Sequence, residues 1–366
     1  MPAWNELLQQ FNAAGSPQQQ GIWVTAELQK ALAAIAAKRS SNVIVYASGF
    51  LQKPAVPPLF LQINHEDVNG LMSVMYGMDW GKPLTLILHT PGGVTNAIET
   101  IGEYLLSKFK RIDVIVPTMA MSAGTMLSLA ADEIIMGRPS QLGPIDPQMP
   151  IGQRSVSARA IVDQFETARG EVLADQRAAH LWAPVLQALG PALLVEARNA
   201  LDYSEKMVAR WMEKRVFAGR QDAAQCAAKT ASWFNASQQH KSHGQRIDRD
   251  EARTQNLNVT DLESDQQLQE LVLTAYHLCT ILFDTGPLVK VMADDRGRQW
   301  AKTFTPPQNP GIPGFFPVAP GQPMPRPMPP VVMPPATPVV APAPPTPAPT
   351  AVPSAAPAAK PIQPPT

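Results

Sequence analysis

The 366-residue chain has little that indicates an electrostatic or redox function. It contains 30 basic and 30 acidic residues and only two cysteines, Cys226 and Cys279. Because the net charge is zero, nothing indicates a surface for nucleic acid or for an anionic membrane. The two cysteines lie far apart in the sequence and form no CxxC pair, so we expect reduced, structural thiols in a cytosolic protein.

Long hydrophobic runs are also missing. The longest, LVLTAYHLCTILF at residues 271–283, is too short to cross a bilayer and carries His277 in its middle. The N-terminal sequence has neither the basic segment nor the apolar segment of a secretory signal. We therefore expect no integral membrane segment and a cytoplasmic location, with peripheral membrane association as the alternative.

Proline is concentrated at one end of the chain. Residues 305–366 hold 24 of the 39 prolines, and their only charged residues are Arg326 and Lys360. Because proline lacks a backbone donor and fixes φ, this segment is predicted to be a disordered, partly polyproline-II tail, able to recruit a partner with aromatic grooves. The predicted organisation is an N-terminal extension at 1–24, one large domain at 25–304 and the tail at 305–366.

Strand and helix patterns alternate through the first half of the domain. The run LTLILHT at 84–90 is apolar throughout, as in parallel strands that are buried on both faces. We therefore predict an α/β fold, with a parallel sheet and right-handed crossover helices. Strands are predicted at 42–48, 84–90, 111–118 and 132–137, and helices at 25–40, 63–78, 94–109 and 122–131.

Three further helical patterns follow, and their apolar faces favour self-association. We therefore expect the protein to form a homo-oligomer. Trp211 and Met207 are predicted to lie in the core or in a subunit interface. His180, Trp182 and Leu186 are predicted to be packing residues rather than ligands. The three patterns cover residues 157–189, 192–216 and 262–285.

Two loops that follow predicted strands carry residues suited to catalysis. One contains Gly92 and Gly93, and the other contains Ser122. In open α/β sheets the functional crevice lies at the carboxyl ends of the strands, and both loops open helices whose first N–H groups are unpaired. Two such groups beside a hydroxyl would form an oxyanion hole next to a nucleophile. The alternative is that Ser122 is a helix N-cap.

Two quoted segments carry a resemblance to a known family. LILHTPGGVTNAIETI, followed by VIVPTMAMSAGTMLSLAADEIIMGRPSQLGPIDPQ, resembles the Clp-protease/crotonase superfamily on its serine-peptidase side. More narrowly, the chain is similar to the serine dehydrogenase proteinase family, a relative of signal peptide peptidase A and of the NfeD-type peptidases. The resemblance covers roughly residues 40–300. It implies a Clp-protease/crotonase-like sheet and helices that project from the core.

The resemblance also implies roles for individual residues. Ser122 matches the nucleophile, and the backbone N–H groups of Gly93 and Ala123 match the oxyanion hole. A substrate strand is then expected to bind along Gly92, Val94 and Thr95.

The residues that serve as general base in the related enzymes are missing from the corresponding positions of this chain. Clp protease has a histidine in the loop that corresponds to residues 140–148, where this chain has Asp146. Signal peptide peptidase A uses a lysine 40–50 residues beyond the serine, but no lysine occurs here between Ser122 and Lys206. Arg159 lies near that position, and a guanidinium is a poor base.

The remaining candidate is His243, oriented by Asp146 in a Ser/His/Asp set of unusual chain order. The alternatives are that His243 is an exposed loop residue beside His240 and Lys241, and that Asp146 caps a neighbouring helix. Lys206 is expected to be an ordinary exposed lysine. His89 is expected to be a core histidine, because no second metal ligand stands at a useful spacing.

Three functions fit these observations. The first is an ATP-independent serine endopeptidase that acts on polypeptides through an acyl-enzyme on Ser122. The second is a crotonase-like acyl-CoA enzyme, and the third is a binding or assembly protein that kept the fold and lost the base. No cofactor or metal is expected for the peptidase.

Overall fold

The computed structural model describes residues 4–152, 154–190, 192–236 and 242–306. Of the tail predicted at 305–366, only Thr305 and Pro306 belong to this part of the chain. His240 and Lys241 also lie outside the described residues.

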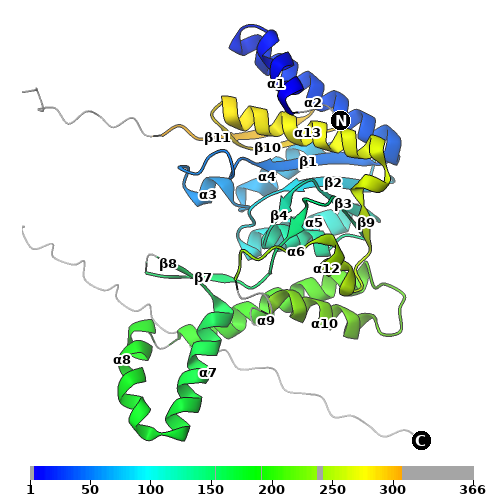
Figure 1. Cartoon of the computed structure of the whole chain (residues 1–366). Helices are drawn as coiled ribbons and strands as arrows, with labels where there is room; N and C mark the ends of the chain where they lie inside the picture. The colour runs from blue at the N-terminus through cyan, green and yellow to red at the C-terminus, as the bar shows by residue number, and fades with distance from the viewer. Residues whose placement is uncertain (1–3, 153, 191, 237–241, 307–366) are drawn as a thin grey trace, which may run out of the picture. The chain divides into compact units, whose positions relative to one another are not determined.

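A seven-stranded sheet forms the centre of the fold, in the order β11–β10–β1–β2–β3–β5–β9 (Figure 1). The strands from β1 to β9 in this order pair in parallel, whereas β10 pairs antiparallel with both β1 and β11. The sheet is therefore mostly parallel, as predicted, with an antiparallel hairpin at one edge that the prediction lacked. The strands are β1 Asn42–Ser48, β2 Leu84–His89, β3 Ile112–Val116, β5 Glu133–Met136, β9 Val259–Asp261, β10 Leu288–Asp294 and β11 Gln299–Thr303.

Helices cover both faces of the sheet. Every residue of β1 and β2 is buried, which explains why both strands are apolar along most of their length. On one face lie α1 Trp4–Ala13, α2 Pro17–Arg39 and α13 Gln266–Thr285. On the other face lie α4 Glu66–Met75, α5 Thr95–Lys108, α6 Ala123–Leu129, α9 Leu193–Lys214 and α10 Ala223–Asn235.

Helix α2 begins earlier than the helix predicted at 25–40. Ser16 accepts a hydrogen bond from the Gln19 amide, and Gln19 bonds back to Ser16, which forms a capping box with Pro17 in the first turn. Helix α2 therefore continues across the boundary between residues 24 and 25, where the sequence analysis placed the start of the domain.

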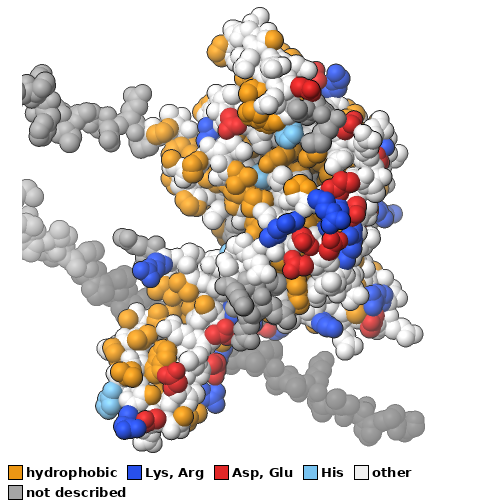
Figure 2. Space-filling view, in the orientation of Figure 1, with side chains coloured by type: hydrophobic (Ala, Val, Ile, Leu, Met, Phe, Trp, Pro, Cys, Tyr) orange, Lys and Arg blue, Asp and Glu red, His pale blue; other side chains and the backbone are white. Residues whose placement is uncertain are grey.

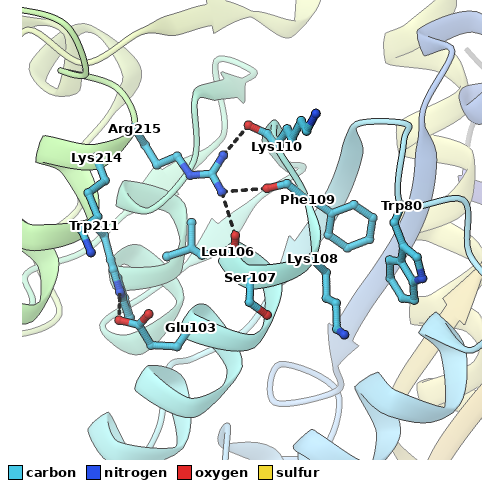
Figure 3. Close-up of a pocket in the computed structure, with 10 residues that line it drawn as sticks. All are labelled: Trp80, Glu103, Leu106, Ser107, Lys108, Phe109, Lys110, Trp211, Lys214 and Arg215. Carbon is cyan, nitrogen blue, oxygen red and sulfur yellow. Dashed lines mark hydrogen bonds between the residues drawn. The ribbon is translucent and has the colours of Figure 1, made fainter.

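Helix α9 is attached to α5 by buried and charge-assisted contacts. Trp211 is buried in the core, and a Cβ added at Gly102 of α5 would lie 2.8 Å from its ring. Arg215 donates to the carbonyl oxygens of Leu106 and Phe109, the unpaired groups at the end of α5 (Figure 3). Trp211 was predicted to lie either in the core or in a subunit interface, and the structure places it in the core.

Helices α7 and α8 form a hairpin outside the layers that cover the sheet (Figure 1). Helix α7, Ala158–Ala174, packs against α9, whereas α8, Ala179–Leu189, buries none of its residues. Trp182 donates to Glu171, and His180 is exposed. Trp182 and Leu186 are half-buried, so the predicted packing is partial within one chain and absent at His180.

The other elements are short. They are α3 Pro58–Leu61, β4 Met119–Ala120, β6 Gln141–Leu142, β7 Gln148–Ile151, β8 Arg154–Ser157, η1 Gln176–Ala178, α12 Arg249–Thr254 and η2 Leu262–Ser264.

No single helix in the described parts of the chain has both the length and the apolar character needed to cross a bilayer. One pair, Gln176–Leu189 and Leu193–Lys214, reaches these limits only when taken together, and it is bent by 66°.

Candidate active site

Ser122 lies at the sharp turn between β4 and α6. Its φ is 51° and its ψ is −112°, a conformation that L-residues other than glycine rarely adopt. The serine stands at the N-cap position of α6, yet its side chain accepts no capping hydrogen bond. The structure thus contradicts the alternative that Ser122 is present as an N-cap, and its hydroxyl is partly exposed.

The Gly92–Gly93 turn lies directly against this serine. Thr90 and Ala120 form a parallel bridge that brings the two loops together. Gly92 has a φ of 99°, and a Cβ at this position would lie 2.7 Å from the Ser122 Cβ and 3.2 Å from the Ala123 amide nitrogen. Only glycine fits at position 92. These distances also confirm that the Gly-Gly turn adjoins the serine, as predicted.

The backbone N–H groups of Gly93 and Ala123 have no acceptor among the described residues, and neither does that of Ser122. On one side of the turn, Ile63 donates to the Gly92 carbonyl at 2.8 Å and accepts from the Val94 amide at 2.9 Å. Because successive peptide groups of an extended segment point to opposite sides, the Gly93 amide points away from Ile63. Val94 is 41% exposed and Thr95 is half-buried.

Asp146 and His243 are hydrogen-bonded to one another. The distance from His243 Nδ1 to Asp146 Oδ1 is 2.8 Å; Asp146 is buried, and the His243 side chain is 27% exposed. Leu142 and Ile247 exchange two backbone hydrogen bonds of 2.9 Å, which align the two segments antiparallel. Asp146 also accepts from Gln148. It caps no helix of the described chain, so that alternative is not supported.

The loop that carries Asp146 passes beside the serine. A Cβ at Gly143 would lie 3.6 Å from the Ser122 amide nitrogen. Thr125 of α6 accepts from the Gly143 amide at 2.9 Å and donates to the Ala120 carbonyl at 2.7 Å. Thr125, which the sequence analysis did not single out, therefore ties the Asp146 loop to the turn that carries the serine.

No hydrogen bond joins Ser122 to His243 in the described parts of the chain. Neither Ser122 Oγ nor His243 Nε2 has a hydrogen-bond partner in the described parts of the chain. Asp146 bonds the Nδ1 side of the ring, so an Nδ1–H tautomer would leave the Nε2 lone pair free to accept a proton. Ser122, His243 and Asp146 are thus the residue types of a Ser/His/Asp set, and the nearby N–H groups of Gly93 and Ala123 have no acceptor among the described residues.

The other candidate bases lie in unsuitable places. Lys206 is 76% exposed and pairs with Asp202 at 2.9 Å, as an ordinary surface lysine does. Burial lowers the pKa of His89 to about 4. Its Nδ1 lies 2.9 Å from Thr118 Oγ1, and its Nε2 has no partner among the described residues, so this core histidine is only half satisfied.

Neither cysteine is a candidate nucleophile. Both are free thiols. Burial raises the pKa of Cys279 to about 12, and a hydrogen bond to Asp222 raises the pKa of Cys226.

Residues 8–179 match the model of a family described as ClpP-like SDH-type serine proteinases. This match makes residues 8–179 similar to that family. The predicted resemblance is thereby confirmed for this part of the chain, which contains Ser122, Gly93 and Asp146, and the roles of these residues stay predictions. The matched region starts before residue 40, where the resemblance was expected to begin. It ends before His243, so the family match says nothing about this histidine.

Two uncharacterized proteins of Methanocaldococcus jannaschii are among the relatives of this chain. One is 41% identical over 92 residues, which are 25% of this chain and 32% of the relative. The other is 37% identical over 119 residues, which are 32% of this chain and 39% of the relative. The matched regions thus span about a third of these relatives' lengths.

Proposed function

We propose that this protein is an ATP-independent serine endopeptidase that hydrolyses polypeptides through an acyl-enzyme on Ser122. The observation that carries the proposal is the Asp146–His243 hydrogen bond of 2.8 Å, in a loop that passes beside a strained, uncapped serine. A helix-capping serine would need neither this backbone conformation nor a histidine–carboxylate pair nearby.

In the proposed first step, the substrate lies beside Gly92, Val94 and Thr95, on the side of the turn where the Gly93 amide has no acceptor among the described residues. Its scissile carbonyl oxygen accepts hydrogen bonds from the N–H groups of Gly93 and Ala123. Ser122 Oγ attacks the carbonyl carbon while His243 Nε2 takes the hydroxyl proton. The buried Asp146 keeps the ring in the Nδ1–H tautomer and stabilises the imidazolium that forms.

In the second half, His243 gives the proton to the leaving amine as the C–N bond breaks, which leaves an ester on Ser122. Water then attacks this ester and transfers a proton to His243 Nε2. The C–Oγ bond breaks, Ser122 recovers its proton from His243, and the carboxylic acid product departs. Each step returns the histidine to the neutral form that accepts the next proton.

We also propose a homo-oligomer, in which partner chains cover α8. Supporting this, Leu173 and Leu181 are each 76% exposed, and hydrophobic side chains gather over the α7–α8 hairpin (Figure 2). The Pro-rich tail would recruit a separate protein with aromatic grooves.

The test is turnover of an unstructured protein such as casein, and of a quenched fluorescent peptide library, by the full chain without nucleotide. Wild type should cleave, and Ser122→Ala should not. His243→Ala and Asp146→Asn should each lose at least about 1,000-fold in kcat, with little change in KM. Wild-type levels of cleavage by Ser122→Ala would point to a contaminant and overturn the proposal. Absence of cleavage by folded wild type would favour the binding-protein alternative.

A further inference from the structure

A buried ion pair lies on the side of the Gly-Gly turn away from Ser122. Lys290 of β10 and Asp67 of α4 are both fully buried, and Lys290 Nζ lies 2.7 and 2.9 Å from the two oxygens of the Asp67 carboxylate. Lys290 interrupts the otherwise apolar run of β10, between Val289 and Val291. The mechanism above uses neither charge.

The pair is bonded to the backbone on both sides of Ile63. Lys290 Nζ donates to the Gln62 carbonyl at 3.0 Å, and Asp67 Oδ2 accepts from the Asn64 amide at 2.8 Å. Tyr46 donates to the same carboxylate oxygen at 3.2 Å. The segment Gln62–Asn64 is not part of any helix or strand, so these bonds replace the regular pairing that it lacks.

Ile63 in turn holds the Gly-Gly turn. Its backbone bonds Gly92 at 2.8 Å and Val94 at 2.9 Å, the two neighbours of Gly93. A Cβ at Gly93 would lie 2.2 Å from the Ile63 carbonyl oxygen, so the space between the two backbones has no room for a side chain. Any displacement of Gln62–Asn64 would therefore move the Gly93 amide.

We propose that Lys290 and Asp67 are positioning residues, which fix the Gly93 amide of the oxyanion hole through the segment Gln62–Asn64. This inference rests on the proposed peptidase function for its catalytic consequence. A donor misplaced by about 1 Å costs on the order of 100-fold in rate, so a rigid support on the far side of the turn has a direct effect on activity.

If Lys290 and Asp67 only stabilised the domain, replacing both by apolar residues would leave the position of the Gly93 amide unchanged. Replacing both members of a buried ion pair by apolar residues of similar volume is often neutral for stability, since neither charge is left unpaired. The double variant Lys290→Met/Asp67→Leu removes the bonds to Gln62 and Asn64 and retains buried volume. It leaves no charge unpaired, but the Tyr46 hydroxyl, the Asn64 amide and the Gln62 carbonyl lose a partner, so some loss of stability is expected in the folded variant.

The experiment compares this variant with wild type by two measurements on the full chain. Hydrogen exchange, followed by mass spectrometry, reports the protection of the Ile63 and Val94 amides, which needs no catalysis. The second-order rate of fluorophosphonate labelling reports the oxyanion hole. The control is Arg39→Met/Asp113→Leu, which removes an ion pair of 2.7 Å at the amino end of β3, the end opposite the site.

We expect the Lys290→Met/Asp67→Leu variant to fold, to exchange both amides faster and to be labelled about 10- to 100-fold more slowly. The control should exchange and label as wild type does. If the apolar variant does not fold, Lys290→Met/Asp67→Asn replaces it on the same two measurements, because it leaves no charge unpaired, keeps an acceptor for Tyr46 and removes the bond to Gln62.

Unchanged protection of Ile63 and Val94 in the folded variant would overturn the proposal. Lost protection with a labelling rate within twofold of wild type would overturn the catalytic consequence. If wild type is not labelled at all, the peptidase function fails, and the exchange data alone still decide whether the pair holds the turn.

Discussion

At the scale of single residues, the site depends on backbone conformations with positive φ, which residues other than glycine rarely adopt. Ser122 has a φ of 51°, and Gly92 beside it has a φ of 99°. Such conformations cost a non-glycine residue on the order of 1–3 kcal/mol and persist where the surroundings enforce them. At Ser122 the enforcing contacts are the pairing of Thr90 with Ala120 and the bonds of Thr125.

The first prediction concerns this strain. Ser122→Gly should be more stable than Ser122→Ala by about 1 kcal/mol, because glycine adopts positive φ without a steric penalty. Both variants should lack peptidase activity. Urea unfolding of the two variants, measured side by side, checks the difference. An alanine variant as stable as the glycine variant would show that the backbone at residue 122 is not strained.

The second prediction concerns His89 and pH. Burial lowers its pKa to about 4 in the folded chain, against an ordinary value of 6.5. Above pH 6.5 the His89 ring is neutral in both the folded and the unfolded chain. Between pH 6.5 and pH 4 the ring binds a proton in the unfolded chain but not in the folded chain. Stability should therefore fall as the pH falls, by about 3 kcal/mol from this group by pH 4.

His89→Gln removes the titrating group. The variant should lose about 3 kcal/mol less than wild type between pH 7 and pH 4, measured by urea unfolding at each pH. Parallel pH curves for the two proteins would contradict the shifted pKa. A difference in the free energy of unfolding that is the same at every pH would report changed packing, and the pH dependence of the two proteins could still be compared.

At the scale of elements, the fully buried strands could be read directly from the sequence. β1, β2, β3 and β5 lie within the predicted ranges because strands buried on both faces are continuous apolar runs. The early start of α2 also had a signal, the Ser16–Pro17–Gln19 capping pattern, which the prediction did not use. The β10–β11 hairpin was missed although Asp295–Gly297 marks its turn.

The segment Gln62–Asn64 had no such signal. It belongs to no strand, and its single bridge from Ile63 to Gly93 depends on residues far away in the sequence, Lys290 among them. Propensity and periodicity describe runs of residues, so one bridging residue held by tertiary contacts leaves no pattern.

The third prediction tests the closeness of this bridge. Gly93→Ala would place a Cβ 2.2 Å from the Ile63 carbonyl oxygen, so the turn must move. We expect about a 100-fold loss of peptidase activity and about 2 kcal/mol of destabilisation.

Gly170→Ala in α7 is the matched control, because no atom lies within 4 Å of the added Cβ. It should stabilise the chain by about 0.5–1 kcal/mol through helix propensity and leave activity unchanged. Equal effects of the two substitutions on activity would contradict the role of the bridge.

At the scale of the whole molecule, the parallel topology explains why distant residues could be assigned to one place. The loops after β2 and β3 meet at the same edge of the sheet, so Gly93 and Ser122 were expected to be neighbours. His243 could be named from the sequence because few histidines were available. Its contact with Asp146 depends on the antiparallel alignment of Leu142 with Ile247, which no local pattern indicates.

The fourth prediction concerns assembly. Leu173→Glu/Leu181→Glu places charges on the most exposed apolar positions of the α7–α8 hairpin. If partner chains cover this surface, the particle mass from light scattering should fall to a smaller species, because burying unpaired charges is costly. Ile22→Glu, on an α2 residue that is 64% exposed, should leave the mass unchanged. An unaltered mass in the double variant would exclude the hairpin from the subunit interface.

The most direct test of the account is covalent labelling of the nucleophile, read by intact mass with a fluorophosphonate probe. Wild type should gain one adduct and Ser122→Ala none. His243→Ala and Asp146→Asn should react at least about 1,000-fold more slowly, whereas His180→Ala, at an exposed position of α8, should react at the wild-type rate. An adduct that persists in Ser122→Ala, or no adduct on folded wild type, would contradict the assignment of Ser122 as an activated nucleophile.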